Sequence, residues 1–98
     1  MEEVIYYNEL YDLYGKLLTE KQREYFENYY FNNLSLSEMA DNYNVSRNAI
    51  HKQLKIVIEK LEDYEDKLKL NSKLKNLELV VKNINDKKVR EEIEKIFY

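Results

Sequence analysis

Apolar side chains recur along most of the chain with the spacing of helices. In the first segment, between Val4 and about Leu18, they stand three or four residues apart, at Tyr6, Leu10, Leu13 and Leu17. This spacing predicts a helix with one apolar face. A second helix is expected to run to about Phe31, with an aromatic face made of Tyr25, Phe26, Tyr29 and Tyr30.

Polar residues between the apolar segments predict where the helices begin. Thr19-Glu20-Lys21-Gln22 has the form of a capping box, in which the threonine hydroxyl accepts a helix amide and the glutamine reaches back. Ser35 and Glu38 have the same spacing and predict the start of a third helix. Ser46 is the expected cap of the fourth helix.

The expected helix ends rest on asparagine. Asn32-Asn33 is predicted to end the second helix, because asparagine often replaces glycine at a left-handed position. The third helix is expected to end near Asn42, followed by the turn Tyr43-Asn44-Val45.

The fourth helix is predicted to be long. Its apolar residues follow a heptad pattern of four and three through Ile50, Leu54, Val57, Leu61, Tyr64 and Leu68. The pattern then slips by one residue and continues through Leu70, Leu74, Leu77, Val81 and Ile84. The slip predicts a bend and a fifth helix, with Asn71-Ser72 as stop and cap. Asn85-Asp86 is expected to cap a last helix, whose inward residues would be Val89, Ile93 and Ile96.

These two seams carry more apolar surface than three short helices could cover. The seams could fold back on the chain's own first helices or pair with a second chain, and a homodimer is the favoured prediction. The candidate dimer seam comprises Leu54, Val57, Leu61, Tyr64, Leu68, Leu74, Leu77 and Val81.

Composition places the chain in the all-α class. It has 98 residues, one glycine (Gly15) and no proline, so little interrupts helical structure. We expect one compact structural unit, divided near residue 60 into N-terminal helices with a helix-turn-helix (1–60) and a continuing long helix with C-terminal helices (61–98). The chain has no cysteine, an acidic start and no apolar run of membrane-spanning length, which favours a cytoplasmic protein.

The segment from 34 to 55 has the pattern of a helix-turn-helix. Ala40 is the small residue needed where two helices cross, and Asn44 suits the positive φ of the turn. Apolar positions around the crossing are supplied by Met39, Tyr43, Val45, Ile50 and Leu54.

If Ile50 and Leu54 are buried, the opposite face of the fourth helix is exposed and polar. This face carries Arg47, Asn48, His51, Lys52 and Lys55, side chains that pair with bases or phosphates. Ser46 and the amides that begin the third helix could bind phosphates as well. The same helix-turn-helix could instead be only a packing module with a solvated face.

Charge gives a mixed indication about nucleic acid. The net charge is −3, whereas dedicated binders usually have a basic footprint. Residues 1–34 have three basic and seven acidic side chains, residues 35–60 four and three, and residues 61–98 nine and nine. The only positive segment therefore contains the helix-turn-helix.

No enzyme, metal site or cofactor is predicted. His51 is the only histidine, and a single glycine cannot form a phosphate-binding loop. His51 is interpreted as an exposed helix residue, with a nucleic-acid contact as the alternative. The tyrosines of the first two helices are interpreted as core or dimer packing rather than as platforms for stacked bases.

The motifs of residues 17–54 resemble region 4 of bacterial sigma factors. The shared features are "LT-x-x-x-R", a tyrosine-bearing helix, "LS-x-x-E-x-A" and "VSR". With "LYGKLLTEKQ" before and "LEDYEDKLKL" after, the chain is more similar still to the YlxM family of small helix-turn-helix proteins. Gly15, Asn32-Asn33 and His51 depart from that pattern.

The resemblance implies a regulatory protein linked to the signal recognition particle pathway. Two functions are therefore expected as alternatives. The first is a dimeric regulator that binds double-stranded DNA weakly or with a partner's help. The second is a protein- or RNA-interaction module of the secretion-targeting machinery, with the helix-turn-helix as scaffold. Membrane insertion is not expected in either case.

Overall fold

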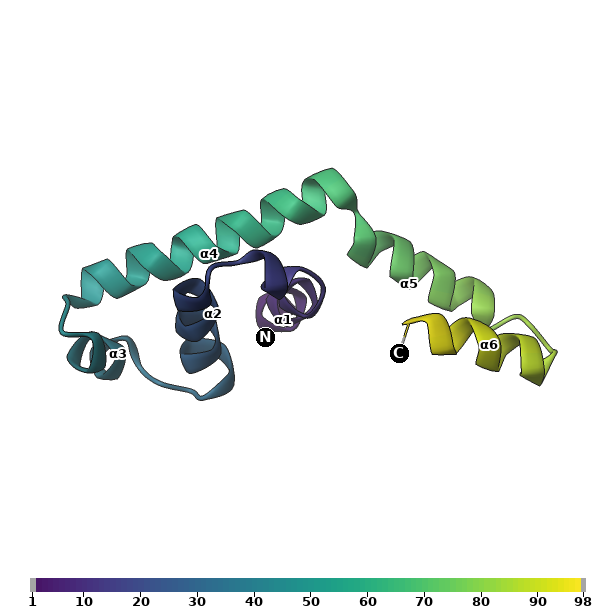
Figure 1. Ribbon diagram of the computed structural model, residues 1–98, viewed down its shortest axis with the longest axis horizontal. Helices are drawn as coiled ribbons and strands as arrows, with labels where there is room; N and C mark the ends of the chain where they lie inside the picture. Colours follow the sequence, from purple (N-terminus) through teal and green to yellow (C-terminus); the bar gives the residue numbers. More distant parts are fainter. Residues whose placement is uncertain (1, 98) are drawn as a thin grey trace. The chain divides into compact units, whose positions relative to one another are not determined.

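The computed structural model describes residues 2–97 and is all-α, with six α-helices and two short helical turns in that range (Figure 1). It divides into two compact units, Met1–Leu68 and Lys69–Tyr98. The boundary lies at the end of a long helix rather than near residue 60, because that helix passes residue 60 without interruption.

The first unit contains four α-helices. They are α1 (Glu2–Tyr14), α2 (Glu20–Phe26), α3 (Leu36–Tyr43) and α4 (Arg47–Leu68). In Figure 1, α1, α2 and α3 all lie along one side of α4. The three shorter helices therefore pack against one side of the long helix.

Two helical turns complete the first unit. A tight 3₁₀ turn, η1 (Gly15–Leu17), follows α1, which is thus shorter than the helix to Leu18 expected from sequence. A wider π-helical turn, η2 (Glu27–Phe31), extends α2, and the amide of Asn32 donates to the carbonyl of Glu27, five residues back, at 2.9 Å. Such turns are uncommon and often occur at functional positions.

The core of the first unit has two buried clusters along α4. One contains Leu10, Tyr14, Leu18, Phe26, Val57 and Leu61. The other contains Tyr25, Met39, Ala40, Ile50 and Leu54. The seam of α4 is thereby covered by helices of the same chain.

This packing corrects part of the expected dimer seam. Leu54, Val57 and Leu61 are at most 6% exposed, and Tyr64 packs against the first cluster. Leu54, Val57 and Leu61 therefore stabilise the first unit and are not available to a second chain, whereas Tyr64 is half-buried in the same unit. Their heptad spacing fits an intrachain seam as well as an interchain one, which is why spacing could not distinguish the two.

The expected helix starts in the first unit are confirmed. Thr19 Oγ1 accepts the amide of Gln22 at 3.1 Å, and Gln22 Oε1 accepts the amide of Thr19 at 3.0 Å. Ser35 and Glu38 make the same reciprocal pair, with both distances 3.0 Å. Each box satisfies two amides that the first turn of a helix leaves without a partner.

The second unit is a pair of helices, α5 (Leu70–Val81) and α6 (Lys87–Phe97). The break before α5 is at Lys69, whose φ of 55° is left-handed. The expectation that Asn71-Ser72 would stop and cap was wrong, because both residues lie inside α5. A left-handed lysine carries no sequence signal, whereas Asn-Ser resembles a cap.

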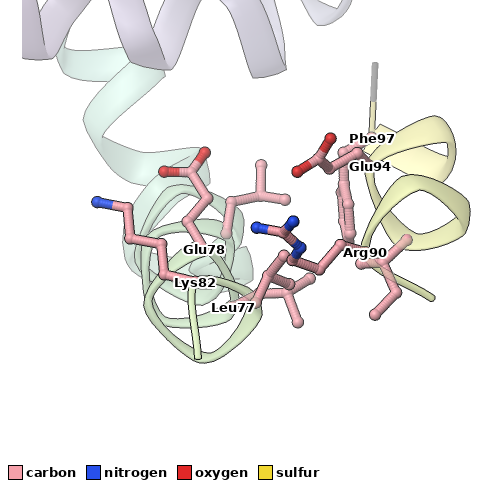
Figure 2. A pocket seen from close by; sticks show the side chains of 9 residues that line it. Leu77, Glu78, Lys82, Arg90, Glu94 and Phe97 are labelled. Carbon is pink, nitrogen blue, oxygen red and sulfur yellow. The ribbon is translucent and has the colours of Figure 1, made fainter. Parts of the chain in front are cut away.

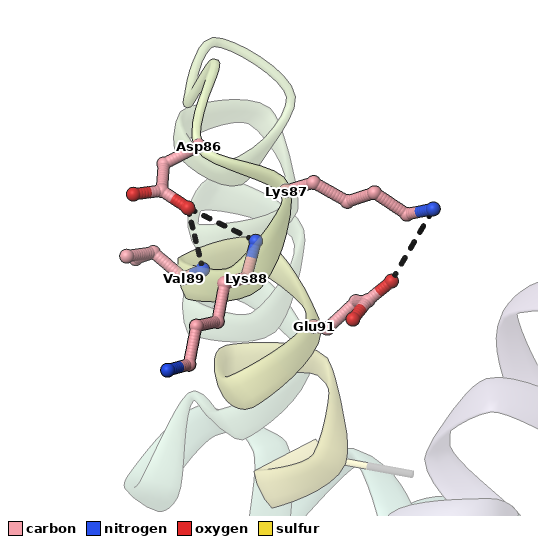
Figure 3. A network of polar contacts seen from close by, with 5 residues as sticks. All are labelled: Asp86, Lys87, Lys88, Val89 and Glu91. Atoms are coloured by element: carbon pink, nitrogen blue, oxygen red, sulfur yellow. Dashed lines mark hydrogen bonds and ion pairs between the residues drawn. The ribbon is translucent and has the colours of Figure 1, made fainter.

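The start of α6 agrees with the sequence pattern. Asp86 Oδ1 accepts the amides of Lys88 and Val89 at 3.0 and 3.2 Å (Figure 3). Lys87, the first residue of α6, forms an ion pair at 3.9 Å with Glu91, which lies about one turn later. The predicted cap by Asp86 is therefore confirmed.

The two helices of the second unit enclose an open pocket of about 250 Å³ (Figure 2). Its apolar lining consists of Leu74, Leu77, Val81, Ile93 and Phe97. The Arg90 side chain projects between Glu78 and Glu94 in Figure 2. Leu74, Leu77 and Val81 of the expected seam thus face this pocket, whereas Leu68 is 45% exposed at the end of α4.

The inward face predicted for α6 was only partly right. Ile93 is half-buried and lines the pocket, but Val89 is 41% and Ile96 79% exposed. Arg90 and Phe97 line the pocket in their place. The apolar face of α6 is therefore wider than α5 covers, and part of it faces outward.

Candidate nucleic-acid interface

The junction of α3 and α4 has the geometry of a helix-turn-helix. Asn44 has φ 54° and ψ 47°, the left-handed conformation that its place in the turn predicted. The amides of Asn44 and Val45 donate to the carbonyls of Asp41 and Ala40, which is the Schellman arrangement of a helix end. Ala40 is 7% exposed in the second core cluster, as expected for the crossing residue.

One apolar position of the expected turn is not buried. Val45 is 43% exposed, although it was expected to pack at the crossing. Met39, Tyr43 and Ile50 pack in the second cluster and cover the crossing without it. Val45 therefore contributes to the surface next to the start of α4.

A polar network fixes α3 against α2. The Tyr43 hydroxyl donates to Glu24 Oε1 at 2.7 Å and accepts from Asn28 Nδ2 at 2.8 Å. Burial and the bond to Glu24 raise the pKa of Tyr43 to about 12, so its proton is retained. This network holds the turn, and with it the start of α4, in one orientation.

The start of α4 is built by Ser46. Its Oγ accepts the amide of Ala49 at 3.1 Å, so the predicted cap is confirmed. The hydroxyl proton of Ser46 is not used by this bond and can donate outward. The remaining amides of the first turn also point out from the helix end, which favours a negative charge there.

The five polar residues predicted for the outer face of α4 lie together on it. Ile50 is fully buried and Leu54 is 6% exposed on the inner face. Arg47, Asn48, His51, Lys52 and Lys55 are all exposed. We call these five residues the basic stripe.

Charge divides α4 into two halves. Residues 42–58 contain three basic side chains and no acidic one, whereas residues 59–68 contain five acidic and two basic ones. The basic stripe lies wholly in the first half. A polyanion is thus attracted to the start of α4 and repelled from its end.

A groove next to the basic stripe was not predicted from sequence. Its volume is about 460 Å³, and it is lined by Tyr7, Tyr29, Tyr30, Leu36, His51, Leu54, Lys55, Ile58, Glu59 and Glu62. We call it the tyrosine groove. Its three tyrosines are half-buried, so core packing, which sequence favoured, describes only one side of each ring.

The two ends of the tyrosine groove differ in charge. His51 and Lys55 lie towards the start of α4, and Glu59 and Glu62 one to two turns later. Burial, with Glu62 and Glu3 nearby, raises the pKa of Tyr7, and burial raises that of Tyr30 to about 12. Tyr7 and Tyr30 therefore stay neutral at ordinary pH.

The π-helical turn positions this groove. It places consecutive Tyr29 and Tyr30 rings edge to face, with centroids 5.0 Å apart, and both line the groove. In a regular α-helix, by contrast, the side chains of neighbouring residues point about 100° apart and do not line one surface together. A paired Tyr-Tyr beside Asn32-Asn33 was the only sequence signal, and it did not predict a groove.

Neither a metal site nor a membrane-spanning helix is found among the described residues. Between residues 2 and 97, no group of three or more histidine, cysteine or acidic side chains could hold a metal ion. Over the same range, no helix is long and apolar enough to cross a membrane.

Comparison with known proteins adds the family to this geometry. Residues 1–97 match the model of the UPF0122 family, described as "Putative helix-turn-helix protein, YlxM / p13 like". The chain belongs to this family. Its YlxM-like identity was the one that the sequence motifs predicted.

Curated relatives span nearly the same length. The UPF0122 protein of Fusobacterium nucleatum is 42% identical over 96 residues, covering 98% of this chain and 93% of the relative. That of Bacillus thuringiensis is 40% identical over 108 aligned positions, covering 98% of both chains. Both helical units are therefore part of what this chain shares with its relatives.

Proposed function

We propose that this YlxM-like protein is a regulator that binds double-stranded DNA through the basic stripe of α4. The observation that carries the proposal is that five exposed polar side chains lie together on the second helix of a helix-turn-helix. The absence of acidic residues from 42 to 58 supports it. Such a protein would act in the cytoplasm.

Each residue of the stripe has a role that its chemistry suggests. Arg47 and Lys52 would pair with phosphate or guanine, and Asn48 with adenine. Ser46 would donate its free hydroxyl proton to a phosphate at the helix start. His51 and Lys55 lie further along α4 and would contact the duplex at the edge of the site.

The weak overall charge sets a limit on affinity. With three basic residues in the stripe and a net charge of −3, few phosphates can be neutralised. Nonspecific affinity rises with the number of neutralised phosphates. We also propose that the chain forms a homodimer.

The test is a double substitution with a matched control. Arg47→Ala with Lys52→Ala should lose most duplex affinity, with a salt dependence shallower by about two phosphate contacts. Lys60→Ala with Lys67→Ala removes the same charge from the acidic half of the same helix and should change affinity little. Equal losses in both variants would mean that net charge alone drives the attraction.

The alternative function also has an observation in its favour. Residues 1–68 contain fourteen acidic and eight basic side chains, a poor balance for a nucleic-acid binder. The family resemblance then suggests an interaction module of the signal recognition particle system, with the helix-turn-helix as scaffold. No measurable duplex binding by the wild type at low salt would favour this alternative.

A further inference from the structure

The tyrosine groove and the outer side of α6 both have exposed apolar residues, and their charged residues are complementary. The groove has apolar walls, formed by Tyr7, Tyr30, Leu54 and Ile58, and follows α4. The outer side of α6 presents Val89 and Ile96, with 41% and 79% of each residue exposed. Both surfaces are apolar and each lacks a covering partner in its own unit.

The charges along the two surfaces match residue by residue. In the groove, Lys55 and Glu59 are four residues apart on α4. On α6, Lys88 and Glu92 have the same spacing and the same order. A spacing of four residues is slightly more than one helical turn, about 6 Å along the axis. If the helices run antiparallel, Lys88 lies opposite Glu59 and Glu92 opposite Lys55.

These charged groups are accessible. The ion pairs Lys67–Asp63 and Lys87–Glu91 involve none of the four side chains. All four are exposed. Figure 3 shows Lys88 and Val89 projecting to the side of α6 opposite the Lys87–Glu91 pair.

Helical spacing places the same surface away from α5. At 100° per residue, Glu92 lies within about 60° of both Val89 and Ile96. Ile96 is about 160° around the helix from Glu94, which lines the pocket facing α5. Docking of α6 through Val89, Glu92 and Ile96 therefore leaves its packing against α5 intact.

We propose that the tyrosine groove binds α6 of a second copy of this chain, antiparallel to α4. Because each copy carries both a groove and an α6, two such contacts close into a symmetric dimer. With 11 residues, α6 is about 16 Å long, which equals the roughly 16 Å of α4 between His51 and Glu62 that lines the groove. The helix therefore fits within the charged length of the groove.

The proposal also assigns a regulation to the basic stripe. His51 and Lys55 belong to both the stripe and the groove. An α6 seated there covers them, so the second copy and a duplex compete for one surface. This consequence rests on the proposed function, whereas the docking itself does not.

A charge exchange tests the docking in the full chain. Sedimentation of the wild type should give a species of twice 12.0 kDa at micromolar concentration. Glu59→Lys and Lys88→Glu should each weaken the dimer by about tenfold or more, because each sets like charges together. The double variant Glu59→Lys/Lys88→Glu should restore it. Asp66→Lys, on the same helix beyond the groove, should neither weaken the dimer nor rescue Lys88→Glu.

Two results would overturn the docking. One is a wild type of 12.0 kDa throughout, because the occupant would then not be a second copy. The other is a dimer that both single variants leave intact, because the contact would then lie elsewhere. Circular dichroism of each variant separates lost association from lost folding.

The regulation is tested by a variant outside the basic stripe. Ile96→Asp should weaken the dimer and raise duplex affinity several-fold, although it adds a negative charge. Ile5→Asp, at a residue 59% exposed in the first unit, is the matched control and should change neither. A weakened dimer with unchanged duplex affinity would refute the competition. Absence of duplex binding in every variant would refute the proposed function while leaving the docking result in place.

Discussion

At the scale of single residues, Gly15 has no room for a side chain, because an aromatic ring packs directly against it. A Cβ there would lie 3.0 Å from Tyr11 Cε2 and 3.2 Å from two further ring atoms. The Tyr11 ring cannot easily move, because it stacks on Phe26 at 4.3 Å and its hydroxyl donates to Glu27 at 2.8 Å. The glycine thus gives the ring its place between α1 and α2.

We expect Gly15→Ala to destabilise the protein. Alanine gains about 0.5–1 kcal/mol in helical backbone preference over glycine. Overpacking a fixed ring costs about 1–3 kcal/mol, so the net loss should be about 1 kcal/mol. Urea denaturation measures it. A stabilised variant would mean that the Tyr11 ring moves freely.

The raised tyrosine pKa values predict unfolding at alkaline pH. Burial raises the pKa of Tyr11, Tyr30 and Tyr43 from 10.0 to about 12, helped by Glu27 for Tyr11 and by Glu24 for Tyr43. The folded state holds these protons more tightly than the unfolded state. Their contribution to stability is therefore complete below pH 10 and is lost as pH rises towards 12.

Melting temperature against pH tests this prediction. It should fall between pH 10 and 12, together with the appearance of phenolate absorbance. Tyr43→Phe should have a shallower fall, because one of the three groups no longer titrates. An unchanged slope in that variant would show that Tyr43 titrates alike in both states.

At the scale of helices, the caps of α3 and α4 are separate contributions to stability. Ser35→Ala and Ser46→Ala each leave one helix amide without its acceptor and should cost about 0.5–2 kcal/mol. Thermal unfolding of both variants measures the cost. Ser37→Ala, at an exposed position in the first turn of α3, is the control and should be near neutral. Wild-type stability in both cap variants would contradict the helix starts.

Local chemistry explains which helix boundaries could be predicted. Thr19, Ser35, Ser46 and Asp86 cap helices through side-chain oxygens, and Asn44 adopts a conformation that asparagine tolerates. These are properties of a few neighbouring residues, so sequence contains them. Lys69 takes the left-handed conformation without any such preference. Its conformation therefore has no local sequence signal.

At the scale of the whole molecule, periodicity predicts that a face is buried but not what buries it. The seam of α4 was expected to pair with a second chain, and the chain's own α1 and α2 cover it instead. The basic stripe was placed correctly, because it needed only the position of Ile50 and Leu54. The tyrosine groove was missed, because it joins residues 7 to 62 through the π-helical turn.

The last prediction follows from the unequal burial of the helices. Four residues of α4 are buried, whereas among the described residues of α6 none is. At low protein concentration, the backbone amides of α6 should therefore exchange with solvent deuterium faster than those of α4. If a second copy covers α6, raising the concentration should slow that exchange while the amides around Ile50 and Leu61 stay unchanged. The Lys88→Glu variant should lose this concentration dependence. Equal protection of α6 and α4 at every concentration would show that the chain itself already covers α6.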